Sequence, residues 1–370
     1  MSRGNPRHAT LQIRAIWLAL GAALLGGFAL AGHLAFVIGY AFDLGNGYAA
    51  YIQVHGYIQL IGWAGMFIIA VSLHFIPRLA GAPIAAPHRL RRLLSLIGTG
   101  LLLRMVCHSV LPYRGPGLTF DALTWGIVLS AVLVCCGVLT YLAVLADVFR
   151  QVRHASDEKP ALMAVRPFFG MMMAGFLVYT WSHLILLGSM AWAEAVVVDR
   201  AWNEWSIEAF TGLTLLPVSF AFSIRLLPLY LRLPPSQWNT RGFAYAYLAA
   251  LGLQLLGTLP IDAMPPQMRA GYIGRGIKAA LILWLVWKLA VLSCRGRRDV
   301  RDTPTAGRPF GRYDWSIYAA YTWLVVGAGL DIVASVSVVA GRGLPLPIDI
   351  VSPVYPLGFV TQLLPGVAPR

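Results

Sequence analysis

Ten apolar stretches follow one another along the chain, and short polar connections separate them. A helix rises 1.5 Å per residue, so about 20 apolar residues suffice to cross a hydrocarbon core of about 30 Å. The pattern therefore predicts an all-α fold, a polytopic bundle of about ten transmembrane helices. The predicted spans are 14–41, 52–77, 91–111, 119–149, 164–193, 207–231, 241–260, 271–294, 314–340 and 351–370.

The composition agrees with this pattern, because 58% of the 370 residues are hydrophobic and only 12% are charged. The surface of a soluble chain with so little charge would aggregate, so we expect a lipid bilayer to cover it. No connection is long enough for a soluble domain, and residues 1–370 are predicted to form a single integral membrane domain. The N-terminus runs straight into the first span, which we expect to be an uncleaved anchor.

The net charge of +14 arises from basic residues in alternate connections. The N-terminus and the connections 78–92, 150–166 and 294–312 are rich in Arg and Lys, whereas 43–47 and 194–208 are not. The positive-inside rule then predicts a multi-pass protein of the inner (cytoplasmic) membrane with a cytoplasmic N-terminus. No basic helix interleaved with aromatic residues stands apart from this pattern, so no nucleic-acid partner is predicted.

Five histidines fall within the predicted spans, and the orientation gives each a depth. His33, His55, His108 and His183 fall in the outer half on four different helices, whereas His74 lies alone at the cytoplasmic end. Polar groups within a membrane are costly and mark pathways, relays or cofactors. Four histidines at one depth indicate a haem or metal site. A proton or ion pathway and structural hydrogen bonds between helices are the alternatives.

His55, Gln59 and Gly62 share one face of the second predicted span, because they are four and seven residues apart. A glycine at position 62 would let a planar macrocycle approach the backbone, and Gln59 could hold a propionate or a water molecule. Ordinary close packing between helices is the alternative role for Gly62.

His74 lies on the same span as His55 but 19 residues further along. At 1.5 Å per residue this is about 28 Å, so the two histidines cannot bind one metal or one haem. We predict that His74 caps the cytoplasmic end beside Pro77 and Arg78. The chain has no H-x-x-x-H or C-x-x-C-H motif, so neither a clustered copper site nor covalent c-type haem is indicated. It also lacks a Walker loop and a G-x-S-x-G motif.

Arg104 and Asp331 are charged residues inside predicted spans. Arg104 precedes His108 by four residues on one helix face, where it could pair with a haem propionate or extend its charge to the interface. Asp331 is the one carboxylate well inside a span, so a proton-transfer role or an arginine partner is expected.

Three segments resemble the NnrS-type membrane proteins, a family associated with haem and copper and linked to the nitric oxide response. They are "HGYIQLIGWAGMFIIAVSLHFIPRLAG" (55–81), "VRPFFGMMMAGF" (165–176) and "PLGFVTQLLPGVAPR" (356–370). The first is also remotely similar to the second span of haem–copper oxidases and nitric oxide reductases, where a histidine holds a low-spin haem. The resemblance implies that His55 is an axial ligand.

The NnrS-type family has a histidine near its C-terminal segment. The corresponding position in this chain is about Tyr355, within "VYPLGF". Tyrosinate can ligate haem iron, and an ordinary tyrosine at the membrane interface is the alternative. Otherwise His33, His108 or His183 would supply the second ligand. No histidine follows His183, which argues against a complete oxygen- or nitric-oxide-reducing centre, since that chemistry needs copper ligands in later spans.

These observations predict a non-covalent haem b, with copper as a further candidate metal, in a haem–copper-oxidase-like helix arrangement. The expected function is haem-dependent handling of nitric oxide or protection against nitrosative stress, and whether the protein is an enzyme is left open. One alternative is a membrane electron-transfer subunit with a quinol or another redox partner. The other is a proton-coupled transporter in which histidines and Asp331 relay protons.

Overall fold

The computed structural model has helices as its regular secondary structure and no β-strand within the residues it describes. The prediction of an all-α fold is therefore confirmed. Eight helical runs are long and apolar enough to cross a membrane, which identifies a multi-pass membrane protein. The described residues are 6–45, 47–84, 86, 88–154, 160–231, 233, 238–261, 265–293, 314–345 and 353–367.

The eight membrane-crossing runs coincide with eight of the ten predicted spans. A helix also forms at the predicted seventh span, α10 (Thr240–Gly257), but it is not among the eight. The predicted tenth span begins outside the described residues and contains only the shorter η6 (Val354–Val360) and α14 (Thr361–Val367). The eight runs are Ile13–Gly39, Gly47–Ala80, His88–Tyr113, Leu118–Val152, Leu162–Trp192, Arg200–Tyr230, Pro266–Leu289 and Asp314–Val339.

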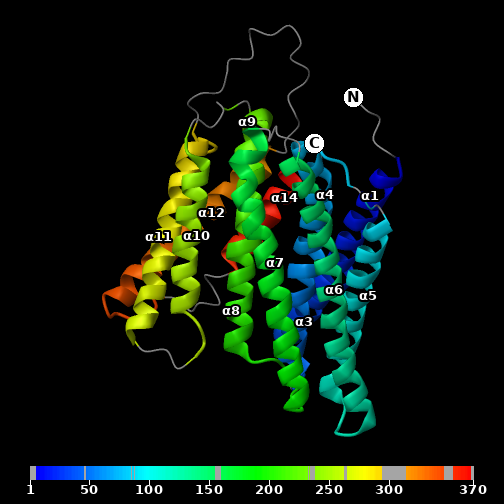
Figure 1. Cartoon of the computed structure of the whole chain (residues 1–370). Coiled ribbons are helices and arrows are strands. Elements are labelled where there is room, and N and C mark those ends of the chain that lie inside the picture. The colour runs from blue at the N-terminus through cyan, green and yellow to red at the C-terminus, as the bar shows by residue number, and fades with distance from the viewer. Residues whose placement is uncertain are drawn as a thin grey trace. The chain divides into compact units, whose positions relative to one another are not determined.

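The chain forms two compact units (Figure 1). Unit 1 consists of Met1–Leu162 and Phe176–Ser206, and unit 2 of Met163–Gly175 and Ile207–Arg370. Two helices contribute to both units. Helix α7 (Pro160–Trp192) begins and ends in unit 1 and passes through unit 2 at Met163–Gly175, whereas α8 (Arg200–Phe210) begins in unit 1 and ends in unit 2. The expectation of a single integral membrane domain stays a prediction.

In unit 1, α5 packs along α6, α1 packs along α4, and η1 packs along η2. A Cβ atom at Gly62 of η2 would lie 2.9 Å from the Cβ of Ala22 in η1, so Gly62 serves close packing between these segments. The helices are α1 (Pro6–Gly21), η1 (Ala22–Phe28), α2 (Ala29–Gly39), α3 (Gly47–Tyr57), η2 (Ile58–Gly65), α4 (Met66–Ala80), α5 (His88–Val110), η3 (Leu111–Tyr113), α6 (Leu118–His154) and the second half of α7.

In unit 2, α11 packs between α10 and α12, and α12 also contacts η6 and α14. Glycines bring α10 and α11 together, because a Cβ atom at Gly257 would lie 2.3 Å from the backbone nitrogen of Gly271. The helices of this unit are the segment Met163–Gly175 of α7, the end of α8, η4 (Thr211–Leu215), α9 (Leu216–Tyr230), α10, α11 (Pro265–Leu289), α12 (Asp314–Val339), η6 and α14.

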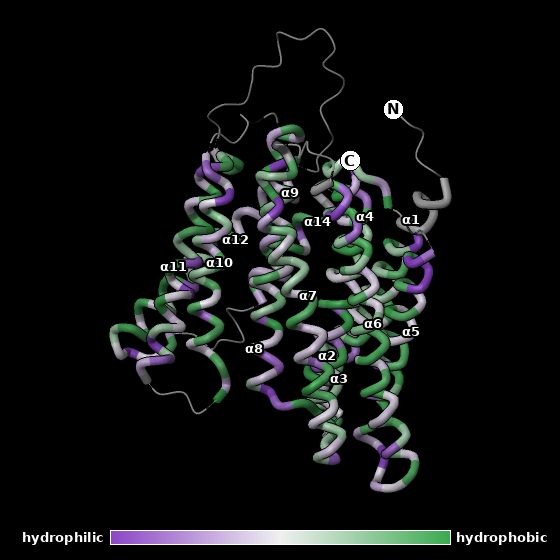
Figure 2. The backbone as a smooth tube through the Cα atoms, in the orientation of Figure 1, coloured by the Kyte–Doolittle hydropathy of each residue, from purple (hydrophilic) through white to green (hydrophobic). Residues whose placement is uncertain are grey.

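Hydrophobic residues run along the long helices, and hydrophilic ones gather mainly near helix ends and connections (Figure 2). Large apolar side chains are exposed along the spans, among them Leu25 (73%) and Ile185 (67%). Such surfaces are stable in contact with lipid rather than water. The basic connection 294–312, on which part of the predicted orientation rests, lies outside the described residues.

Helix α4 ends in a motif that explains its last residues. Gly81 has a φ of 71°, its amide donates to the carbonyl of Arg78, and the amide of Ala82 donates to the carbonyl of Pro77. This pair of bonds is a Schellman motif, which favours glycine at the left-handed position. Pro77 and Gly81, four residues apart at the end of the segment 55–81, therefore belong to a helix stop.

Candidate functional site

His108 lies on α5 in unit 1, is completely buried and uses one ring nitrogen for the protein backbone. Its Nε2 is 2.9 Å from the carbonyl oxygen of Val196. A carbonyl can only accept, so Nε2 carries the proton and Nδ1 carries the lone pair. Nδ1 is buried and has no hydrogen-bond partner in the part of the chain that the structure describes.

His183 on α7 shows the same arrangement. Its Nε2 is 3.5 Å from the hydroxyl oxygen of Ser206, whose own proton goes to the carbonyl of Asn203. The Ser206 oxygen therefore accepts a long hydrogen bond from Nε2, and Nδ1 is again buried without a partner among the described residues. The rings of Tyr57 and Tyr179 pack on the imidazole, with centroids 5.1 and 4.3 Å away.

Arg104 precedes His108 by one turn of α5, as the sequence predicts, and it is 1% exposed. Its guanidinium lies 5.2 Å from the ring centroid of Tyr57, and its charge interacts with both His108 and His183. Nε and Nη1 have no hydrogen-bond partner within the described ranges. The side chain therefore does not extend to an interface, which was one of its two predicted roles.

His55 lies on α3 and faces η1 rather than the Arg104 cluster. Its Nδ1 donates to the carbonyl of Gly27 at 2.9 Å, which leaves the lone pair on Nε2. Gln59 packs on the same residue, since a Cβ at Gly27 would overlap its amide. Tyr57, two residues after His55, points about 200° away around the helix and contacts His183 instead.

The remaining histidines of the predicted spans are placed differently. His33 is exposed on α2, with its ring edge-on to Tyr51 at 5.5 Å. His74 accepts a hydrogen bond from Arg78 at 2.5 Å, near the end of α4. No group of three or more His, Cys, Asp or Glu side chains that could hold a metal ion occurs among the residues described. The four outer-half histidines are all in unit 1, but they do not form one such cluster.

The chemistry of the cluster formed by Tyr57, Arg104, His108, Tyr179 and His183 suits a haem better than a bare metal ion. Ligating histidines commonly donate one ring N–H to a protein oxygen, which fixes the ring and frees the other nitrogen. Haem iron takes up to two axial protein ligands. The nearby charge of Arg104 opposes a bare cation, whereas a haem brings anionic propionates that its free donors could bind.

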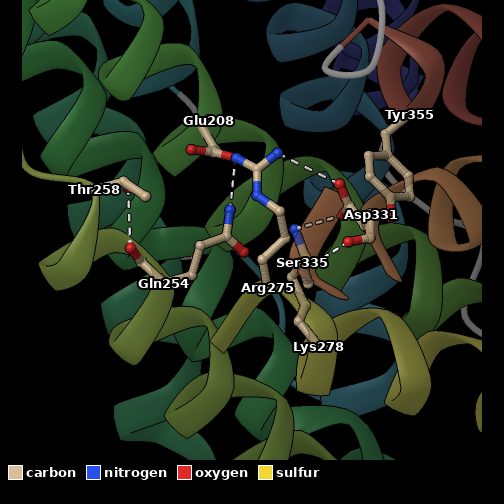
Figure 3. A network of polar contacts seen from close by, with 8 residues as sticks. All are labelled: Glu208, Gln254, Thr258, Arg275, Lys278, Asp331, Ser335 and Tyr355. Carbon is tan, nitrogen blue, oxygen red and sulfur yellow. Dashed lines mark hydrogen bonds and ion pairs between the residues drawn. The ribbon is translucent and has the colours of Figure 1, made fainter. Parts of the chain in front are cut away.

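Unit 2 contains a second set of buried polar groups (Figure 3). Asp331 on α12 is 2% exposed and accepts a hydrogen bond from the hydroxyl of Tyr355 on η6 at 2.8 Å. The side chains of Arg275 and Lys278 on α11 lie 3.5 and 3.4 Å from its carboxylate oxygens. The predicted arginine partner of Asp331 is therefore confirmed. Tyr355 is the position that corresponds to the histidine of the NnrS-type family. Its hydroxyl donates to Asp331.

The sequence interpretation missed Glu208, Gln254, Arg275 and Lys278 of this set. Arg275 also pairs with Glu208 at the end of α8, and the amide nitrogen of Gln254 donates to the same carboxylate oxygen at 2.6 Å. One signal was available, because Arg275 and Lys278 are three residues apart within a predicted span and so share a helix face. Two cations there require anions nearby.

Comparison of the chain with protein-family models, curated proteins and solved structures finds no match. The resemblance to the NnrS-type family thus stays a prediction.

Proposed function

We propose that the protein is a membrane haem protein with a non-covalent haem b in unit 1, held at His108 and His183. One observation carries the proposal: Arg104, His108 and His183 are buried together, and each keeps ring or guanidinium nitrogens without a hydrogen-bond partner among the described residues. An unsatisfied buried donor or acceptor costs about 1–3 kcal/mol. A haem would use these groups as axial ligands and as a propionate partner.

The proposed role is haem-dependent handling of nitric oxide or protection against nitrosative stress, which rests on the resemblance of residues 55–81 and 165–176. Copper is proposed only as a further metal. A redox partner or quinol belongs to the related electron-transfer function. The proposal also includes about ten spans, a haem–copper-oxidase-like arrangement, an inner-membrane location and a cytoplasmic N-terminus. The apolar helices support the multi-pass membrane character, and the finer points rest on the sequence.

The test is the absorption spectrum of detergent-purified protein, together with haem and metal analysis. We expect a Soret band that responds to reduction and to nitric oxide. His108→Ala and His183→Ala should each abolish or shift the band. His33→Ala is the matched control, because His33 is an exposed histidine of the same unit and should leave the spectrum unchanged.

His55→Ala separates two locations for the haem. If the cluster around Arg104 holds the haem, the spectrum survives this substitution. A spectrum lost in His55→Ala and retained in His108→Ala and His183→Ala would assign the haem to the α3–η1 side and overturn our assignment. Purified protein without haem, and without uptake of added haem, would reject the function itself.

Proton-coupled transport is the second candidate, and the charged network of unit 2 favours it. Ionisable residues within membrane spans commonly line proton or ion pathways. This function predicts pH-dependent flux into vesicles by protein that contains no haem.

A further inference from the structure

Unit 2 buries four charged groups whose charges balance. Arg275 pairs with Glu208 and with Asp331, and Lys278 pairs with Asp331. The groups come from three helices, α8, α11 and α12. Figure 3 shows Glu208 and Asp331 on opposite sides of the guanidinium of Arg275, with Lys278 directed to Asp331. With two cations and two carboxylates, this network is neutral. A neutral network avoids most of the cost of burying single charges.

Both carboxylate oxygens of Asp331 already accept from donors. Oδ1 faces Arg275 at 3.5 Å, and Oδ2 faces Lys278 at 3.4 Å and the hydroxyl of Tyr355 at 2.8 Å. The side chain is only 2% exposed. Three of the roughly four acceptor positions of the Asp331 carboxylate are therefore occupied, and water has little access to it.

Glu208 is arranged differently. Its Oε1 accepts from both Arg275 and Gln254, whereas Oε2 accepts no hydrogen bond from the described residues. Figure 3 shows this second oxygen pointing away from Arg275. The side chain is 20% exposed, against 5% or less for the other three charged groups. Glu208 therefore has both a free oxygen and the better access.

We propose that Glu208 is a proton-binding site within unit 2. When Glu208 is protonated, Arg275 keeps its ion pair with Asp331. The proton comes from water, an O–H bond forms at Oε2, and no other covalent bond changes. The charge of the network goes from zero to one positive. Arg275 keeps a carboxylate partner throughout, so proton binding at Glu208 does not leave its guanidinium unpaired.

The groups that face the two carboxylates are known from every neighbouring element. Arg275 and Tyr272 of α11 and Gln254 of α10 face Glu208. Asp331 is faced by Arg275 and Lys278 of α11, Tyr355 of η6 and Tyr247 of α10. Arginine stays protonated under all ordinary conditions. The two carboxylates are thus the groups between which a proton site must be chosen, and the free oxygen selects Glu208.

The experiment is infrared difference spectroscopy of the full chain in lipid nanodiscs, between neutral and acidic pH. The chain has four glutamates, Glu158, Glu194, Glu204 and Glu208, so ¹³C labelling of glutamate carboxyls adds few reporters. A protonated carboxyl in an apolar environment absorbs at higher wavenumber than one in water. We expect such a band, and it should shift when glutamate is labelled.

Glu208→Gln should remove this band. Glu204→Gln is the matched control, since Glu204 lies on the same helix, one turn earlier and more exposed, and should leave the band in place. A band that shifts with labelled aspartate instead would overturn the proposal, as would a band retained in Glu208→Gln. The labelling result needs only native protein, so a variant that fails to fold does not obscure it. None of these outcomes depends on haem binding in unit 1.

Discussion

Arg104 in unit 1 and Arg275 in unit 2 are both almost completely buried, but only Arg275 has carboxylate partners among the described residues. Arg104 contacts the face of Tyr57 and keeps two nitrogens without hydrogen-bond partners in the described chain. Within the described residues, carboxylates compensate the charge of Arg275 but not that of Arg104.

The difference indicates different roles for the two units. A buried ion pair brings little net stability, but loss of one partner is costly because the other charge stays behind. Arg275 therefore belongs to a network whose charges balance within unit 2. Arg104 has no carboxylate partner among the described residues, and in the proposed function a haem propionate would compensate its charge.

The largest expected effect is in unit 2. Arg275→Met leaves Glu208 and Asp331 with one cation, Lys278, and should lower the free energy of unfolding by about 3–5 kcal/mol. Thermal unfolding in detergent measures this. The double variant Arg275→Met/Glu208→Gln restores the charge balance and should recover part of the loss. An unchanged single variant would contradict the importance of the network.

The matching substitution in unit 1, Arg104→Met, should not lower the free energy of unfolding. In haem-free protein, Arg104→Met removes unsatisfied donors that cost about 1–3 kcal/mol each, against one cation–π contact worth about 2 kcal/mol. Stability should stay level or rise, while retention of haem in loaded protein should fall. The same unfolding assay, with and without haem, checks both. A loss as large as that of Arg275→Met would mean that Arg104 is compensated internally.

Neutral hydrogen bonds, rather than ion pairs, hold the connection between α7 and α8 against α3 in unit 1. Gln53 on α3 donates to the carbonyl of Val198 and accepts from its amide, both at 3.0 Å. Val198 is buried, so Gln53→Leu should cost about 1–3 kcal/mol locally. Hydrogen exchange at the Val198 amide should become faster.

Gln151→Leu is the control for this substitution. Gln151 makes a single exposed bond of 3.3 Å to the carbonyl of Pro83, so exchange rates should change little. Unchanged exchange at Val198 in Gln53→Leu would show that other contacts hold this connection.

The sequence predicted the helices well because apolar length is a local property. It also placed Arg104 and His108 on one face, since their spacing of four residues is local. It could not assign partners that depend on packing. Glu208 lies where the predicted connection 194–208 overlaps the start of the predicted span 207–231, but α8 begins at Arg200, which places Glu208 two turns inside a helix. His55 was grouped by depth with His108 and His183, although depth says nothing about direction around a helix.

The smallest expected effect is at the surface of α8 and sets the scale for the others. Glu204 pairs with Arg200 at 2.5 Å, but both side chains are well exposed, at 40% and 74%. Helical ion pairs of this kind contribute about 0.3–0.5 kcal/mol, and salt screens them. Glu204→Gln should therefore barely change the unfolding temperature, and the change should be smaller still at high salt. Since Glu204 and Glu208 are one turn apart, a larger effect at Glu208 measures burial and the shared Arg275 rather than the helix itself.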